Sequence, residues 1–330
     1  MMLQMNRREF SLLSAAALSA AMPGLALAQA KFPERPIKLV VPFSAGGVND
    51  VVGRQWADKM KAPLGAVYVE NQGGGGGTIG AMDVVRSAAD GHTLFLGSTS
   101  TMVLNAMTNP KLPYDPASFE PITILCVSST SIAVHPSVPA QNVKEFLAYA
   151  KANAGKLSYG SAGTGTMSHL SGELFKQLTG IADMTHIPYK GAGPGITDLV
   201  SGHITVMSPN ITGQLLQLHQ TGKIRILAIN APRRLSATPD IPTAIEQGVP
   251  YMIGQLFLGI YAPKGTPQAV IEQIAKATRD ALADPAYQKA LGDSGFETVA
   301  NSGPAEARRY MAEEKERWEP VVKAINLKMQ

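Results

Sequence analysis

The sequence predicts an α/β protein with two domains, each built around a mostly parallel sheet. Three observations predict this class. Short apolar runs alternate with amphipathic segments along the chain, as in βαβ units with right-handed crossovers. The tripeptide Ser-Ala-Gly occurs at residues 44–46 and again at 161–163, each time between an apolar run and an amphipathic segment. The length of 330 residues favours two domains over one.

Composition excludes several classes of function. Hydrophobic residues make up 45% of the chain and charged residues 16%, so a large core can form. The net charge of +4 is carried by lysines and arginines that are spread along the chain and do not cluster. We therefore expect no binding to nucleic acid or to anionic lipid.

The first thirty residues have the pattern of an export signal. Arg7 and Arg8 precede an Ala/Leu/Ser-rich stretch, and Ala28-Gln29-Ala30 supplies small residues for cleavage after Ala30. The arginine pair followed by Phe10 is similar to a twin-arginine signal, while the general secretory route stays open. The prediction is a periplasmic protein whose mature chain has no membrane span.

Residues 37–60 join a strand, a turn and a helix. Ile37 to Val41 is a short apolar run typical of a strand covered on both faces. Ser44, Ala45, Gly46 and Gly47 form the turn, and the helical pattern begins after Val48, with Asn49 or Asp50 as its N-cap. Uncapped amides and the helix dipole favour an anion at such a junction.

A second strand–turn–helix passage follows. Residues 66–70 are expected as a strand, residues 79–88 as a helix and residues 93–96 as the closing strand. The glycine run 73–77 lacks the Gly-Lys-Ser/Thr of a phosphate loop, so we interpret it as a turn that lets backbone pass close to a partner or ligand. Ser98 and Thr99 come after the strand and are interpreted both as ligand contacts and as caps of a helix at 102–107.

The apolar stretch from Ile122 to Val134 is longer than the other expected strands. Because it follows a complete α/β unit and precedes a new helix at 143–152, it is interpreted as the crossing into a second domain. Residues 253–261 are the expected return crossing. Cys126, the one cysteine, lies in the first crossing, is expected to be a small core residue, and allows no internal disulfide.

Residues 156–178 repeat the first theme. A strand at 157–159 leads into a turn with Ser161, Ala162, Gly163 and Thr164, and Thr166 or Ser168 can cap the next helix. Two such loops, each opening a different domain, predict a cleft held from both walls. The remaining expected elements are strands at 184–187, 203–207 and 224–229 and helices at 196–201, 211–220, 266–284, 285–294 and 304–326.

Signs of catalysis are weak. No G-x-S-x-G elbow, metal-binding motif or paired carboxylates are present in the turns, so neither cofactor nor metal is expected. A hydrolase using Ser161 with His169 and a distant acid stays open as an alternative. His169 and His186 are interpreted as cap or loop hydrogen-bond partners.

Several segments together resemble the Bug-type (TctC-like) receptors of tripartite tricarboxylate transporters along nearly the whole mature chain. The resemblance rests on FPERPIKLVVPFSAGG, VENQGGGGGTIGA, GHTLFLGS, LPYDPASFEPI, HPSVPA, GKLSYGSAGTGTMSHLSGELFKQLTG, HIPYKGAGPGITDLVSGHI, GKIRILAI and YAPKGTP, in this order. It implies a type II periplasmic binding protein fold, with two α/β domains joined by two crossing strands. It also implies that loops 43–49 and 161–166 hold a ligand carboxylate through backbone amides and water.

Two positions depart from many members of this family. Pro209-Asn210 stands where an Asp-Asn pair is common, which disfavours an amino-acid ligand. Phe257 stands in place of a tryptophan, as an aromatic wall of the pocket.

The resulting hypothesis is a periplasmic, monomeric receptor, not an enzyme, that captures a dicarboxylate or aromatic carboxylate and delivers it to a tripartite permease. A sensor kinase is the alternative partner. The expected domains are residues 31–132 with 255–330 and residues 133–254, with hinges near Ala133 and Gly254. The expected ligand-binding residues are Phe43, Ser44, Ala45, Gly46, Asn49, Ser98, Thr99, Ser161, Ala162, Gly163, Thr164, Thr166, Asn210 and Phe257.

Overall fold

The computed structural model describes residues 32–325. The expected export signal, residues 1–30, lies outside the described residues. The chain divides into two units, residues 1–34 and residues 35–330. Of the first unit only residues 32–34 are described, and the Phe32–Pro33 peptide bond is cis. All that follows concerns the second unit.

The first sheet has six strands in the order β11-β4-β10-β3-β1-β2. Four of the six (β1, β2, β3 and β4) run in one direction, whereas β10 and β11 oppose them. The sheet is therefore mostly parallel, as the sequence predicts. The bounds are Ile37–Val41 (β1), Val67–Asn71 (β2), Thr93–Ser98 (β3), Phe119–Ser129 (β4), Gln255–Pro263 (β10) and Phe296–Thr298 (β11).

The second sheet has five strands in the order β7-β6-β8-β5-β9. Four of them run in one direction and β5 opposes them. The bounds are Ser131–Val134 (β5), Leu157–Ser161 (β6), Met184–Pro188 (β7), Val206–Met207 (β8) and Arg225–Ile229 (β9). We call the parts of the chain that build the first and second sheets the first and second lobe.

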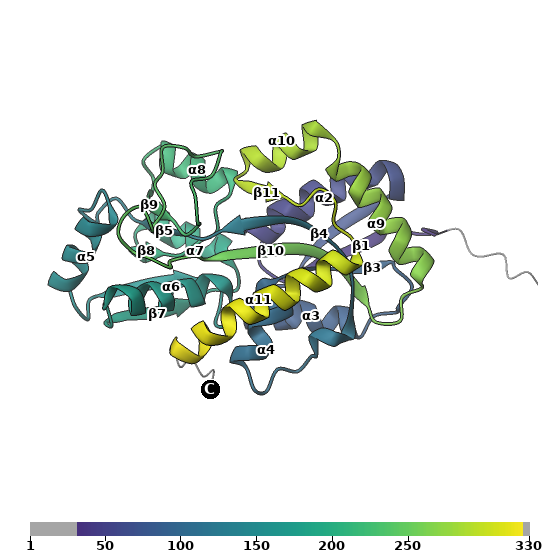
Figure 1. Ribbon diagram of the computed structural model, residues 1–330, viewed down its shortest axis with the longest axis horizontal. Helices are drawn as coiled ribbons and strands as arrows, with labels where there is room; N and C mark the ends of the chain where they lie inside the picture. Colours follow the sequence, from purple (N-terminus) through teal and green to yellow (C-terminus); the bar gives the residue numbers. More distant parts are fainter. Residues whose placement is uncertain (1–31, 326–330) are drawn as a thin grey trace, which may run out of the picture. The chain divides into compact units, whose positions relative to one another are not determined.

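The two lobes are connected at Thr130 and Gly254. β4 ends at Ser129 and β5 begins at Ser131, so the long apolar stretch is two strands that belong to different sheets. The Thr130 N–H donates to Gly254 O at 2.7 Å, which places the two crossings side by side (Figure 1). The first crossing lies before Ala133, which pairs within the second sheet.

Helices cover both sheets (Figure 1). In the first lobe α2 and α9 pack on each other, and α9 and α11 pack on β4; in the second lobe α6 and α7 contact β6. The C-terminal helix α11 also contacts α6, so it touches both lobes. The bounds are Val48–Leu64 (α2), Thr78–Val85 (α3), Asn105–Thr108 (α4), Val143–Ala152 (α5), Met167–Thr179 (α6), Ala192–Ser201 (α7), Gly213–Gln220 (α8), Gln268–Leu282 (α9), Pro285–Asp293 (α10) and Pro304–Ile325 (α11), with short 3₁₀ helices at Gly75–Gly77 (η1) and Pro116–Ser118 (η3).

Some expected elements are corrected by the structure. The N-cap of α2 is Gly47, because helical geometry already begins at Val48, so neither Asn49 nor Asp50 is the cap. Helix α7 begins at Ala192 instead of residue 196, since glycines start the helix from a turn. Residues 100–104 form a π-helix (η2), and the short strand β11 was missed by the sequence analysis.

The apolar residues form clusters inside each lobe. One cluster gathers around Met207, Ile211 and Ile229 in the second lobe, and another around Phe95, Phe119 and Phe257 in the first. Cys126 has no exposed surface, which confirms its place in the core, and burial raises the pKa of its thiol above its usual value. None of the described helices combines the length and apolar character that a bilayer crossing requires.

Candidate ligand-binding site

The first loop leaves β1 and starts helix α2. Gly47 is an N-cap without a side-chain hydrogen bond, so the first N–H groups of α2 have no partner within the helix. Asp50 reaches back and accepts from Gly46 N at 3.0 Å, which stiffens the turn. Burial raises the pKa of the Asp50 carboxyl, but hydrogen bonds from Arg54, Gly46 and Asn71 outweigh burial and leave that pKa below its usual value.

The second loop leaves β6 and starts helix α6. Its turn is held by hydrogen bonds to side chains: Gly163 N donates to Ser161 Oγ at 3.1 Å, and Gly165 N donates to His169 Nδ1 at 3.1 Å. Thr166 is the N-cap of α6, as expected, and its Oγ1 also donates to Gly163 O at 2.7 Å. The loop therefore has a defined shape before any ligand is considered.

The two lobes touch through backbone and small side chains around these loops. Ser44 N donates to Lys190 O at 3.1 Å, and Met167 N donates to Ser100 Oγ at 3.0 Å. A Cβ on Gly76 would lie 2.5 Å from Thr164 O of the other lobe. The glycine run 73–77 thus lets backbone pass close to backbone, which is the role the sequence predicts for it.

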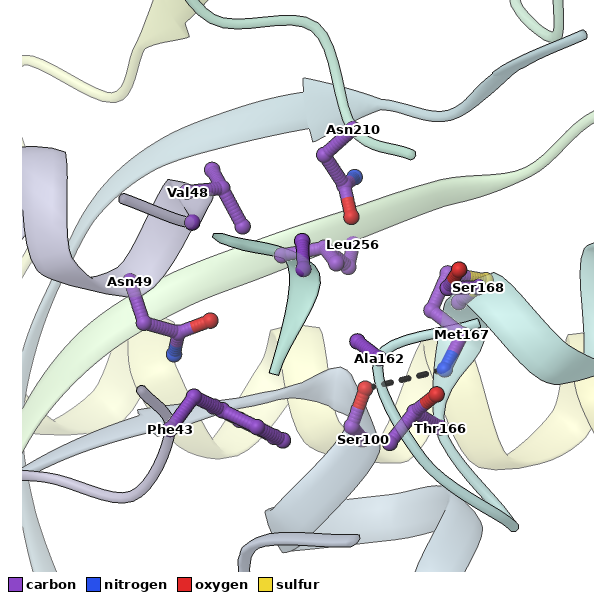
Figure 2. Close-up of a pocket in the computed structure, with 12 residues that line it drawn as sticks. Phe43, Val48, Asn49, Ser100, Ala162, Thr166, Met167, Ser168, Asn210 and Leu256 are labelled. Atoms are coloured by element: carbon purple, nitrogen blue, oxygen red, sulfur yellow. Dashed lines mark hydrogen bonds between the residues drawn. The ribbon is translucent and has the colours of Figure 1, made fainter. Parts of the chain in front are cut away.

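A cavity of about 20 Å³ lies between the lobes, with room for about one water molecule. Three helices begin at its wall: α2 from the first lobe, and α6 and α7 from the second. Figure 2 shows the starts of α2, at Val48, and of α6, at Met167. Since helix N-termini carry partial positive charge, their convergence favours an anion. The lining residues are Phe43, Gly47, Val48, Asn49, Ser100, Ala162, Thr166, Met167, Ser168, Ala192, Asn210 and Leu256.

Two side-chain amides supply further donors. Asn49 Nδ2 and Asn210 Nδ2 are buried and, among residues 32–325, have no hydrogen-bond partner. Buried donors normally have partners, so both are suited to a ligand acceptor. They lie on opposite lobes and border the same space (Figure 2). None of the twelve lining residues is charged.

The structure brings five of the predicted site residues to the cavity: Phe43, Asn49, Ala162, Thr166 and Asn210. Others support the loops without lining it. Ser44 contacts Lys190, Gly46 binds Asp50, and Ser161 and Gly163 bind each other. Ala45 is exposed, and Thr164 lines an outer groove with Gly76, Tyr189 and Lys190.

Three predicted residues lie elsewhere. The expected aromatic wall at Phe257 is corrected: neighbouring strand residues face opposite sides, so Leu256 faces the cavity and Phe257 packs in the core of the first lobe. Thr99 accepts from Phe257 N at 2.9 Å, and Ser98 is buried beside it. Neither of these two hydroxyls lines the cavity, because the following π-helix places Ser100 there.

Several lining residues were missed by sequence reasoning. Ser100 belongs to the hydroxyl cluster that the sequence singles out, but only the π-helix decides which hydroxyl faces the cavity. Ala192 was missed because the start of α7 was placed too late; the Gly191-Ala192-Gly193 run was the available signal. His169 and His186 are loop hydrogen-bond partners, as the sequence analysis interprets them.

Metal-binding groups are scarce. Within residues 32–325, no three or more His, Cys, Asp or Glu side chains come together in a way that could hold a metal ion.

Two α/β lobes joined by paired crossings, with an uncharged cavity between them, are the arrangement of a solute-binding protein. A family model described as the tripartite tricarboxylate transporter family receptor matches residues 52–327, and this chain belongs to that family. It is thus a solute-binding receptor of the periplasmic binding protein type.

Solved structures agree with this assignment. The periplasmic binding protein BugD is 33% identical, with a TM-score of 0.86 over 91% of this chain and 100% of that chain. MatC from Rhodopseudomonas palustris, with bound malate, is 32% identical, with a TM-score of 0.83 over 88% of this chain and 100% of that chain. Rpa4515 from R. palustris, with adipate, is 30% identical, with a TM-score of 0.85 over 89% of this chain and 98% of that chain. These likenesses bear out the expected two-domain fold and the Bug-type resemblance.

Proposed function

We propose that this chain is exported to the periplasm, captures a small organic dicarboxylate between its lobes and delivers it to a tripartite tricarboxylate permease. The observation that carries the proposal is the convergence, on one uncharged cavity, of three helix N-termini and two asparagine amides that have no partner in the described part of the chain. Such a site stabilises a carboxylate by donated hydrogen bonds, without the desolvation cost of a buried cation. Malate and adipate in two similar proteins support the dicarboxylate class.

The cavity also implies a movement. Its volume of about 20 Å³ is too small for a dicarboxylate, so the lobes must separate for the solute to enter. We propose that they turn about Thr130 and Gly254, where the chain crosses between the first and the second lobe. The carboxylate then joins the two loops and favours an arrangement in which the lobes close around it, with a cavity wide enough to hold the ligand.

Calorimetry and thermal unfolding with malate and adipate test the proposal. A ligand at a hundred times its Kd stabilises the folded protein by about 2.7 kcal/mol, so a clear rise in Tm is expected. Hexanoate and glutamate serve as comparison ligands, because one lacks the second carboxylate and the other adds an ammonium. No rise in Tm with any dicarboxylate at millimolar concentration would count against a carboxylate receptor.

The asparagine amides are tested by Asn49→Ala and Asn210→Ala. Each removes a donor to a charged acceptor, which contributes about 1.5–3 kcal/mol, so dicarboxylate affinity should fall at least tenfold. Asn301→Ala is the matched control, since Asn301 is exposed and does not line the cavity. If all three variants bind equally, the cavity between the lobes is not the ligand site.

One observation favours a second function. Ser161 Oγ lies 2.6 Å from His186 Nε2, which is the contact that a serine nucleophile needs. However, Ser161 is fully buried, and burial lowers the pKa of His186 to about 3, which makes it a weak base. In residues 32–325 no carboxylate hydrogen-bonds His186.

Generic ester turnover before and after Ser161→Ala separates the two functions. A receptor shows no serine-dependent rate. A rate that disappears with the hydroxyl would support the hydrolase.

A further inference from the structure

Two stacked imidazoles lie behind the second binding loop. The rings of His169, on α6, and His186, on β7, have centroids 3.8 Å apart and planes only 8° apart. Each ring reaches a different part of the loop. His169 Nδ1 accepts from Gly165 N at 3.1 Å, and His186 Nε2 contacts Ser161 Oγ at 2.6 Å.

The second contact continues into the backbone. Ser161 Oγ accepts from Gly163 N at 3.1 Å, so its own hydrogen is available for His186 Nε2. A chain of hydrogen bonds therefore runs from the Gly163 amide through Ser161 to His186. Together the two rings hold the amides of Gly163 and Gly165, which flank Thr164 between the cavity-lining residues Ala162 and Thr166.

The arrangement needs both rings to be neutral. A proton on His169 Nδ1 would face the Gly165 N–H, which is itself a donor. Burial lowers the pKa of His169 to about 4 and that of His186 to about 3. The other groups that face the pair are Tyr159, Glu173 and Lys176; Tyr159 stacks on both rings and donates to Glu173, which pairs with Lys176 at 3.0 Å.

We propose that His169 and His186 are positioning residues of the binding loop, which set the direction of its amides toward the ligand without touching it. Neither ring lines the cavity. The inference rests on the proposed function, because it assigns these residues to the same carboxylate site. It also gives the Ser161–His186 contact a role that needs no catalysis.

Paired variants test the hydrogen-bond role against simple packing. Asn places an oxygen acceptor where His has Nδ1, and Gln places one where His has Nε2. His169→Asn and His186→Gln should keep malate or adipate affinity within about fivefold. His169→Leu and His186→Leu have similar bulk but no acceptor, and should lose at least tenfold.

His219→Leu is the matched control. His219 Nδ1 also accepts a hydrogen bond from a backbone amide, that of Ile226, at 3.3 Å. His219 lies in the last turn of α8 and does not contact the second loop. This variant should lose stability without losing affinity. Equal affinities for the Leu and the Asn or Gln variants at 169 and 186 would overturn the proposal.

A measurement without ligand keeps the inference separate from the proposed function. Amide hydrogen exchange at Gly163 and Gly165 should be slow in the wild-type protein and in the Asn and Gln variants, and at least tenfold faster in the Leu variants. Unchanged exchange in the Leu variants would overturn the inference even if malate binds. If exchange responds as expected but no dicarboxylate binds, the positioning role stands and the proposed function fails.

Discussion

The polar side chains in and around the cavity have different roles. Ser100 Oγ accepts from Met167 N, so one hydroxyl of the first lobe caps a helix of the second. Within residues 32–325 the amide nitrogens of Asn49 and Asn210 have no hydrogen-bond partner, and His169 and His186 contact the second loop from behind. Residues of similar chemistry therefore divide into proposed ligand donors, contacts between the lobes and supports of the second loop.

The buried histidines predict how stability depends on pH. His169 has an ordinary pKa of 6.5 when unfolded and a folded pKa lowered to about 4 by burial and by Lys176. Below pH 6.5 the unfolded chain therefore binds a proton that the folded chain does not, and stability falls as the pH falls toward 4. The loss from this histidine is about 3 kcal/mol over that range.

Urea unfolding between pH 7 and pH 4 measures this dependence. His169→Asn removes one of the two buried rings whose pKa is lowered and should make the curve less steep, while His186 and carboxylates elsewhere keep their own acid dependence. An identical curve for the variant and the wild-type protein would contradict the assignment.

Among the elements, the crossings and the helix N-termini position the residues of the candidate site. Thr130 is bonded on all sides: its N–H donates to Gly254 O, and its Oγ1 donates to Ser171 Oγ and accepts from Asn230 Nδ2. A Cβ on Gly254 would collide with Thr130 Oγ1 and Ser171 Oγ. The two crossing strands are thus tied together at the point where the lobes connect.

Gly254→Ala is expected to destabilise the protein by about 1–3 kcal/mol, as overpacking at a buried position does. Gly292→Ala is the comparison, because a Cβ at this α10 position meets nothing within 4 Å. There the change should stabilise the protein by about 0.5 kcal/mol, since alanine favours a helix over glycine. Thermal unfolding measures both, and equal effects would show that the close approach at Gly254 is unimportant.

For the whole molecule, the contact between the two lobes depends on glycines that allow backbone to meet backbone. Gly76 approaches Thr164 across the lobes, and Gly193 approaches Ala45. The neighbouring Gly75 has a similar positive φ, 57° against 64°, but its Cβ would meet only Thr78 of its own lobe. Substitutions at Gly75 and Gly76 should therefore cause similar backbone strain, but only a substitution at Gly76 should obstruct the contact between the lobes.

Gly76→Ala should lower dicarboxylate affinity about tenfold or more, because the closed arrangement is obstructed. Gly75→Ala should cost a similar 1–2 kcal/mol of left-handed strain but keep its affinity. Calorimetry gives the affinities, and small-angle scattering with ligand shows whether the Gly76 variant stays open. Equal affinity of the two variants would argue against closure through this contact.

The sequence by itself determined the two strand–turn–helix loops and the two crossings, because strand, glycine turn and helix start are local patterns. Five of the residues that it predicts for the ligand site, Phe43, Asn49, Ala162, Thr166 and Asn210, line the cavity between the lobes. Tertiary structure alone decided that Ser100 faces the cavity in preference to Ser98 and Thr99, and Leu256 in preference to Phe257. Those choices depend on a π-helix and on which face of β10 meets the core. They are set by packing between segments far apart in the chain, which no local pattern records.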